Sequence, residues 1–281
     1  MLVHNGVRTL LRHPSVGAMP RLPFPAYLDH LRRDSERFRA ALTDADPRAR
    51  VPSCPDWNAA DLLFHLSGVQ HFWSRIVAGR PAGPDGVEEP ARPASYADLL
   101  ALYDASHAAL VDALAGADPA EQAWTWAPEQ TVGFIFRRQA HEALIHRLDA
   151  ELTVGDVTPL DPTLAADGVE EALDVMFGGC PPWGEFAGLP HHVRVDSTDT
   201  GDSVWVQIGR FRGTDPDDVH YDEDDISVVA DPGTEPDAVV EGAAAELDAW
   251  LWRRRDDSGV RVHGDRAVYD HFRLAVNQPI N

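Results

Sequence analysis

Residues 131–152 read TVGFIFRRQAHEALIHRLDAEL and predict a long helix, the last of four such patterns in the first half of the chain. Breaks rich in Pro or Gly follow the other three patterns. The three earlier helical patterns lie at 25–44, 58–78 and 95–116. Helices of this length joined by loops pack most simply as a four-helix bundle. We therefore expect such a bundle over residues 21–155.

The fourth helical pattern carries two side chains that can bind a metal together. Glu142 and His146 are four residues apart, which places them about 40° apart around a helix, so both can project from one face. A carboxylate and an imidazole at this spacing can bind one divalent ion, by the logic of the H-E-x-x-H motif. His141 lies about 100° around from Glu142 and is the poorer candidate.

A third ligand has to come from another helix, as in the metal sites of bundle cores. His65 in the second pattern is flanked by apolar residues and is expected to face inward. His30 and His107, in the first and third patterns, could each lie at the surface. Spacing alone leaves alternatives open, because a Glu–His pair also occurs on helix surfaces, and His65 could be a core histidine.

The second half of the chain has a mixed pattern that predicts a small α+β domain over residues 160–281. Alternating segments rich in Val and Ile predict strands at 192–196, 203–208, 226–230 and 260–262. Helical patterns lie at 164–176, 237–254 and 266–275. Seven acidic residues fall within 215–225, which we expect to be a solvated, mobile loop.

The charge of the chain excludes several function classes. Its 281 residues include 24 Arg, no Lys and 46 acidic residues, for a net charge of -22. Such a chain does not favour nucleic acid or anionic lipid as a partner. Without Lys it cannot use a lysine Schiff base or a P-loop lysine. Residues 1–150 hold 15 Arg against 18 acidic residues, whereas residues 151–281 hold 9 against 28, so the acidity belongs to the second half.

The remaining composition indicates a cytoplasmic protein. Cys54 and Cys180 are too few for a disulfide framework and favour free thiols in a reducing compartment. No stretch approaches 18 apolar residues, so no membrane span is expected. Residues 1–20 lack the apolar core of a signal peptide, and we expect them to be a disordered extension.

Three segments resemble a known family. Residues 51–57 (VPSCPDW) with 60–66 (ADLLFHL), and residues 141–151 (HEALIHRLDAE), are similar to two signatures of mycothiol-dependent maleylpyruvate isomerase-like proteins. Residues 238–252, with Val262-His-Gly-Asp265 after them, resemble the C-terminal domain of that family. The resemblance implies an N-terminal DinB-like four-helix bundle followed by a domain resembling sterol carrier protein 2.

The resemblance also implies a site and a reaction. His65, Glu142 and His146 would hold a divalent metal, usually zinc, and mycothiol or a similar small thiol would be the second cofactor. Arg254 would contact the substrate, although Arg253 to Arg255 equally suit a solvated helix end.

We therefore expect a metal- and thiol-dependent isomerase or S-transferase acting on a small electrophilic, carboxylate-bearing substrate, as a monomer or homodimer. The alternative is a non-catalytic, metal-stabilised protein that binds a small molecule or lipid. The sequence by itself does not separate these two functions.

Overall fold

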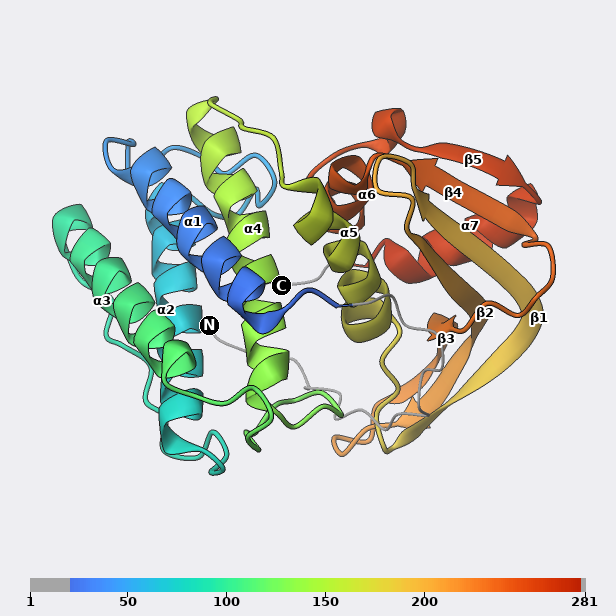
Figure 1. The fold of residues 1–281 in the computed structure, drawn as a ribbon, viewed down its shortest axis with the longest axis horizontal. Helices are drawn as coiled ribbons and strands as arrows, with labels where there is room; N and C mark the ends of the chain where they lie inside the picture. Colours follow the sequence, from blue (N-terminus) through green and yellow to red (C-terminus); the bar gives the residue numbers. More distant parts are fainter. Residues whose placement is uncertain (1–20, 279–281) are drawn as a thin grey trace. The chain divides into compact units, whose positions relative to one another are not determined.

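The computed structural model describes residues 21–278, which divide into two compact units (Figure 1). One unit comprises Leu22–Thr125 and Glu129–Leu160, and the chain from Asp161 onward forms most of the other. The disordered extension expected at residues 1–20 lies outside the described residues. Among the helices that the structure describes, none is long and apolar enough to cross a membrane.

The first unit contains the four predicted helices. They are α1 (Phe24–Leu42), α2 (Ala59–Gly79), α3 (Tyr96–Ala115) and α4 (Val132–Val154). The most extensive helix contacts are those of α1 with α4 and of α2 with α3, and α2 also packs on α4. The core between them includes fully buried Tyr27, Phe38 and Tyr103. The N-terminal part is therefore a helical bundle, as the sequence predicts.

Local capping explains where these helices begin and end. The Asn58 side chain accepts a hydrogen bond from the backbone N–H of Asp61, and the Asp61 carboxylate accepts one from the backbone N–H of Asn58, which completes a capping box. Thr131 caps α4 through the N–H of Phe134. At the other end of α4, Gly155 adopts φ 74°, a left-handed conformation that costs glycine little.

The second unit combines helices with one five-stranded sheet. It begins with α5 (Pro162–Glu171) and the short π-helix η1 (Ala172–Phe177). The strands are β1 (Gly184–Ser197), β2 (Ser203–Thr214), β3 (His220–Val229), β4 (Ala238–Gly242) and β5 (Arg261–Gly264). Their order is β3-β2-β1-β4-β5, with β1 and β4 parallel and the other pairs antiparallel. The C-terminal part is therefore α+β, as predicted.

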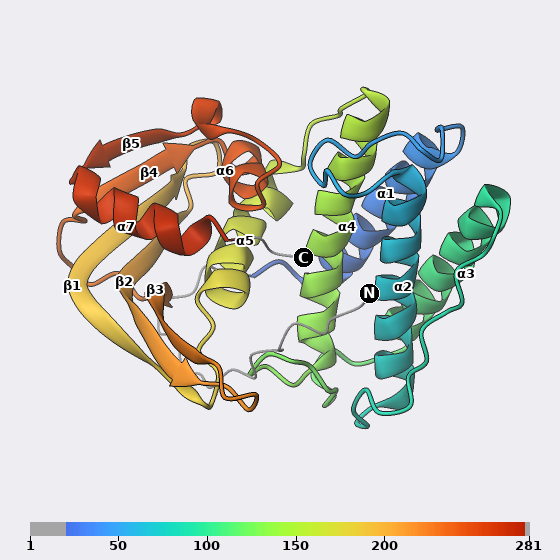
Figure 2. The ribbon, with the colours of Figure 1, turned by 180° about the vertical axis from the view of Figure 1, so that it is seen from behind.

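Two further helices complete this unit. The helix α6 (Ala244–Leu251) packs against α5, and the short 3-10 turn η2 (Asp257–Gly259) follows it. The last helix, α7 (Arg266–Val276), contacts four of the strands and lies across the sheet, as Figure 2 shows. Its buried positions recur at helical spacing, which gives α7 one apolar face. They are Val268, Tyr269, Phe272, Ala275 and Val276.

Two expectations for the second half are wrong. Residues 237–254 are not one helix, because β4 occupies the first five positions from Ala238 and pairs in parallel with Val193–Ser197 of β1. Residues 215–225 are not one loop, because β3 begins at His220. There Arg210 of β2 forms ion pairs of 2.7 Å with both Asp222 and Asp224. Cross-strand arginines thus reduce the repulsion between acids that made a strand look unfavourable.

Candidate metal centre

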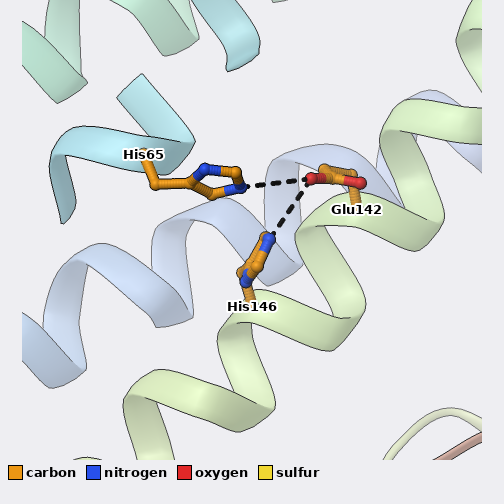
Figure 3. A group of neighbouring side chains, drawn as sticks. All are labelled: His65, Glu142 and His146. Carbon is orange, nitrogen blue, oxygen red and sulfur yellow. Dashed lines mark hydrogen bonds and ion pairs between the residues drawn. The ribbon is translucent and has the colours of Figure 1, made fainter. Parts of the chain in front are cut away.

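Three side chains from two helices of the first unit converge on one point (Figure 3). His65 comes from α2, and Glu142 and His146 come from α4. Oε1 of Glu142 lies 3.7 Å from Nε2 of His65 and 3.2 Å from Nε2 of His146. One ligand atom from each residue lies within 4.8 Å of the others. The structure therefore brings together the three residues that the sequence singled out.

Two of the three separations between ligand atoms of this triad are close to those around a bound zinc ion. Zinc binds His nitrogen and carboxylate oxygen at about 2.0–2.2 Å, so tetrahedral ligand atoms lie about 3.4 Å apart. The distances of 3.2 and 3.7 Å from the Glu142 oxygen bracket that value. Two imidazoles and one carboxylate also match the three-ligand sets of zinc sites that keep one position open.

The triad is also the place where α4 opens to solvent. From Val132 to Glu151, Glu142 is the one residue that is partly exposed, whereas the others are buried. The exposed fractions of the three side chains are 24% for His65, 18% for Glu142 and 8% for His146. The triad is therefore in contact with solvent, whereas the rest of this stretch of α4 is buried.

A second layer of contacts holds the triad in place. Arg138 donates from Nη2 to Oε2 of Glu142 at 2.8 Å, which leaves Oε1 directed at the two histidines. Nδ1 of His146 lies 2.9 Å from Oδ2 of Asp149. The ring of Trp57 lies over His65, with 4.7 Å between ring centroids. Each ligand is thus supported by a neighbour that does not itself join the triad.

The surroundings of the triad separate the pKa values of its members. Burial lowers the pKa of His65 and outweighs the hydrogen bond to Glu142. Burial alone would raise the pKa of Glu142, but hydrogen bonds from the two histidines and the charge of Arg138 bring it well below its usual range. Burial likewise opposes the charged form of His146, yet its bonds to Asp149 and Glu142 raise its pKa to about 9. The site therefore keeps an ionised carboxylate, and His146 has to release a proton before its Nε2 can bind a metal.

The other candidate histidines lie elsewhere in the bundle. His141 is buried on another side of α4, with its ring edge-on to Tyr27, which agrees with its exclusion on helical spacing. His30 is only 8% exposed, so a surface position is wrong for it, because it shares the inner face of α1 with Tyr27. His107 is partly buried, with its ring parallel to Tyr103.

Arg254 lies in the second unit, just after α6. Its backbone N–H donates to the carbonyl of Ala249, and Nη1 donates to the carbonyl of Trp252 at 2.6 Å. The side chain is partly buried, whereas Arg253 and Arg255 are exposed. Among the three arginines, Arg254 is therefore the one that the structure sets apart from a solvated helix end.

The second unit also has a surface hollow of about 590 Å³ near the ends of β1, β2 and β3. Its walls combine the aromatic rings of Trp183 and Tyr221 with exposed charged groups such as Arg212 and Asp222. Arg212 and Asp222 pair with each other at 3.3 Å. The hollow is open to solvent, and its lining combines polar with apolar surface.

Sequence reasoning missed the residues that support the triad. Arg138 lies four residues before Glu142, and Asp149 lies three residues after His146, so helical spacing alone could have indicated both contacts. Trp57 lies in the segment 51–57 that carries the family resemblance, but only the structure shows that its ring packs on His65. Ser53 carried no such signal, because it reaches Asp149 only through the tertiary fold.

Fold and site together define a two-part protein: a helical bundle with a His–Glu–His candidate metal centre, followed by an α+β unit. Residues 28–151 match the model of the mycothiol maleylpyruvate isomerase N-terminal domain, and residues 163–271 match that of the C-terminal domain of the same proteins. The chain belongs to this family. A search of curated protein sequences gave no match.

Two solved structures resemble the chain. They are crystal structures of the mycothiol-dependent maleylpyruvate isomerase and of a variant with one histidine replaced by alanine. Both have a TM-score of 0.55 and cover 86% of this chain and 93% of their own, with 14% and 13% sequence identity. At this identity the likeness concerns the fold.

Proposed function

We propose that this protein is an enzyme that uses a divalent metal and mycothiol, or a similar small thiol, to isomerise a small electrophilic, carboxylate-bearing substrate or to transfer the thiol to it. The observation that carries the proposal is the His65–Glu142–His146 triad, whose ligand atoms lie within 4.8 Å of one another at the open point of α4. Family membership and the names of the two solved relatives support the thiol-dependent isomerase activity.

In this proposal the chain's own residues build the metal site and bind the substrate. His65 and His146 direct Nε2 atoms to a common point, and Glu142 adds one carboxylate oxygen. With two neutral imidazoles and one carboxylate, a bound divalent ion retains net positive charge and stabilises the thiolate form of the cofactor. Zinc is the ion that this donor set suits best.

The chain supplies no thiol of its own to the triad. Cys54 and Cys180 form no disulfide and are partly buried, and neither belongs to the cluster of potential ligands. We therefore assign the nucleophile to the small-molecule thiol. Arg254 is proposed to hold the substrate carboxylate, for which a guanidinium offers two parallel hydrogen bonds.

The first experiment combines metal analysis with an activity screen. Purified protein should hold about one zinc per chain, and His65→Ala and His146→Ala should each lose it. His71→Ala is the matched control, because His71 lies on α2 but outside the triad. Maleylpyruvate and other cis-enoyl diacids are then tested with and without mycothiol. Metal content that both triad variants retain would overturn the proposal.

A second experiment separates the enzyme from a metal-stabilised binding protein. Protein loaded with Co²⁺ is titrated with the thiol, and a new charge-transfer absorption band is expected when sulfur binds at the open position. A cobalt spectrum that does not change with thiol would favour the non-catalytic alternative. Arg254→Gln is expected to raise KM for a carboxylate substrate more than it lowers kcat.

A further inference from the structure

The ligand His146 is connected to a distant loop through a buried carboxylate. Nδ1 of His146 lies 2.9 Å from Oδ2 of Asp149, and the other oxygen of Asp149 accepts a hydrogen bond from the hydroxyl of Ser53. The side chain of Asp149 is fully buried, and that of His146 is 8% exposed. Ser53 lies 96 residues earlier in the chain, in the loop between α1 and α2.

This connection determines which nitrogen of His146 is available for a metal. A carboxylate accepts hydrogen bonds only, so the neutral imidazole next to Asp149 carries its proton on Nδ1. The lone pair of Nε2 then points at Glu142 and His65, where the metal belongs. Of the two histidines in the triad, His146 is the one with such a contact from its own helix.

We propose that Asp149 and Ser53 are positioning residues of the metal centre: Ser53 fixes the Asp149 carboxylate, which holds His146 in the tautomer that binds metal through Nε2. This inference rests on the metal site of the proposed function. Carboxylates behind ligating histidines fix the ring orientation and raise the basicity of the ligand nitrogen. The loop residue Ser53 thereby acts on the centre without touching a ligand.

The variant Asp149→Asn tests the carboxylate at nearly constant volume. An amide can present its NH₂ group to Nδ1, which would place the imidazole proton on Nε2 and block metal binding there. We expect the zinc dissociation constant, measured by competition with a chromogenic chelator, to rise about 10–100-fold. Ser53→Ala removes one outer hydrogen bond and should raise it about five-fold, and Ser53→Thr, which keeps a hydroxyl, should restore the affinity.

One further readout and a control variant separate positioning from general stability. Long-range ¹H–¹⁵N correlation spectra of the metal-free protein, recorded above pH 9 where His146 is neutral, should show its proton on Nδ1 in the wild type, with a changed pattern in Asp149→Asn. Ser74→Ala is the matched control for Ser53→Ala, because this buried α2 hydroxyl bonds only to the carbonyl of His71. Its zinc affinity should equal that of the wild type.

The possible results distinguish this inference from the proposed function. Wild-type protein that binds no zinc overturns both. Wild-type protein that binds zinc, together with an Asp149→Asn variant of equal affinity and an unchanged tautomer, overturns the positioning role while the proposed function stands. The double variant Ser53→Ala/Asp149→Asn should weaken zinc binding no more than Asp149→Asn alone, since both residues act through one histidine.

Discussion

The two units of this protein differ in whether they contain buried ion pairs. The helical unit has exposed pairs, such as Arg32 with Asp29, but it also has a buried group, in which the side chains of Arg147, Asp34 and Glu151 are 6%, 8% and 0% exposed. In the α+β unit, the acids are many and the pairs lie at the surface, as between Arg210 and Asp222, whose side chains are 37% and 57% exposed. The net charge of -22 therefore describes one part of the molecule and not the other.

The difference shows where charge affects stability. A buried ion that loses its partner remains desolvated and destabilises the fold strongly, whereas an exposed one is solvated by water. We expect charge-removing substitutions to have large effects in this buried group of the bundle and small ones on the sheet. The following predictions test this contrast, from the largest expected effect to the smallest.

The largest effect is expected for Arg147→Ala. Arg147 lies 3.0 Å from Asp34 and donates to Oγ1 of Thr158 at 2.6 Å, so its removal takes a buried cation away from Asp34, whereas Glu151 still pairs with Arg37. The free energy of unfolding in urea should fall by about 3–5 kcal/mol. Arg147→Lys keeps the charge but not the forked geometry of the guanidinium, so its free energy of unfolding should lie between those of the wild type and Arg147→Ala. A loss below about 1 kcal/mol, as for an exposed ion pair, would contradict the expected difference between buried and exposed charges.

The second effect is a pH dependence of the metal-free bundle. The pKa of His146 is raised to about 9 from an ordinary value of 6.5. Its contribution to stability is therefore complete below pH 6.5 and is lost as the pH rises through 9, to an extent of at most about 3 kcal/mol. Urea midpoints between pH 6.5 and 9.5 should fall accordingly.

The α+β unit should respond at the other end of the pH scale. The backbone N–H groups of Val219 and Asp217 and the hydroxyl of Tyr221 lower the pKa of Asp215, and Arg210 and Arg212 lower that of Asp222. Such acids contribute stability that is present above pH 3.8 and lost as the pH falls further. In the His146→Gln variant the alkaline loss should disappear while the acid loss remains. An alkaline loss that persists would assign it to another group.

Helix caps act locally, so removing a cap should cost about the same free energy of unfolding in the bundle as in the α+β unit. Asn58 caps α2 in the bundle, and Asp265 caps α7 in the α+β unit through the N–H groups of Ala267 and Val268. Asn58→Ala and Asp265→Ala should each cost about 1 kcal/mol in urea unfolding. A several-fold difference between the two would show that charge or burial of the unit contributes to capping.

The smallest effect is expected for Arg210→Ala. Arg210 pairs with Asp222 and Asp224, yet it lies on the exposed part of the sheet. The urea midpoint should remain within experimental error of the wild type at physiological salt, because exposed pairs are screened and contribute little. A clear shift at 0.5 M NaCl would indicate a structural role for the acidic strand β3.

The sequence predictions succeed where an element depends on residues close to it in the chain and fail where it depends on distant ones. The starts of α2 and α4 were predicted because Asn58 and Thr131 cap their own helices. Strand β4 was mistaken for helix because residues 238–242 pair with β1, more than forty residues earlier in the chain. A helical pattern read from spacing alone does not contain that pairing.

The same distinction between local and distant contacts applies to the residues of the candidate site. Glu142 and His146 lie on one helical face, so their spacing predicted them. His65 belongs to another helix, and the residues alone left it open whether it was a ligand or a core histidine. Only the packing of α2 on α4 places its Nε2 atom 3.7 Å from Glu142.

The sequence by itself determined the helical bundle, the α+β class of the second half, the ends of the long helices and the pair of ligands on α4, because these depend on residues within a few turns of one another. The tertiary structure decided the meeting of His65 with that pair, the contact of Ser53 with Asp149 and the arginine partners of the acidic strand. Each of these joins segments distant in the chain, and their contacts arise only when the apolar faces of the helices and strands are buried together.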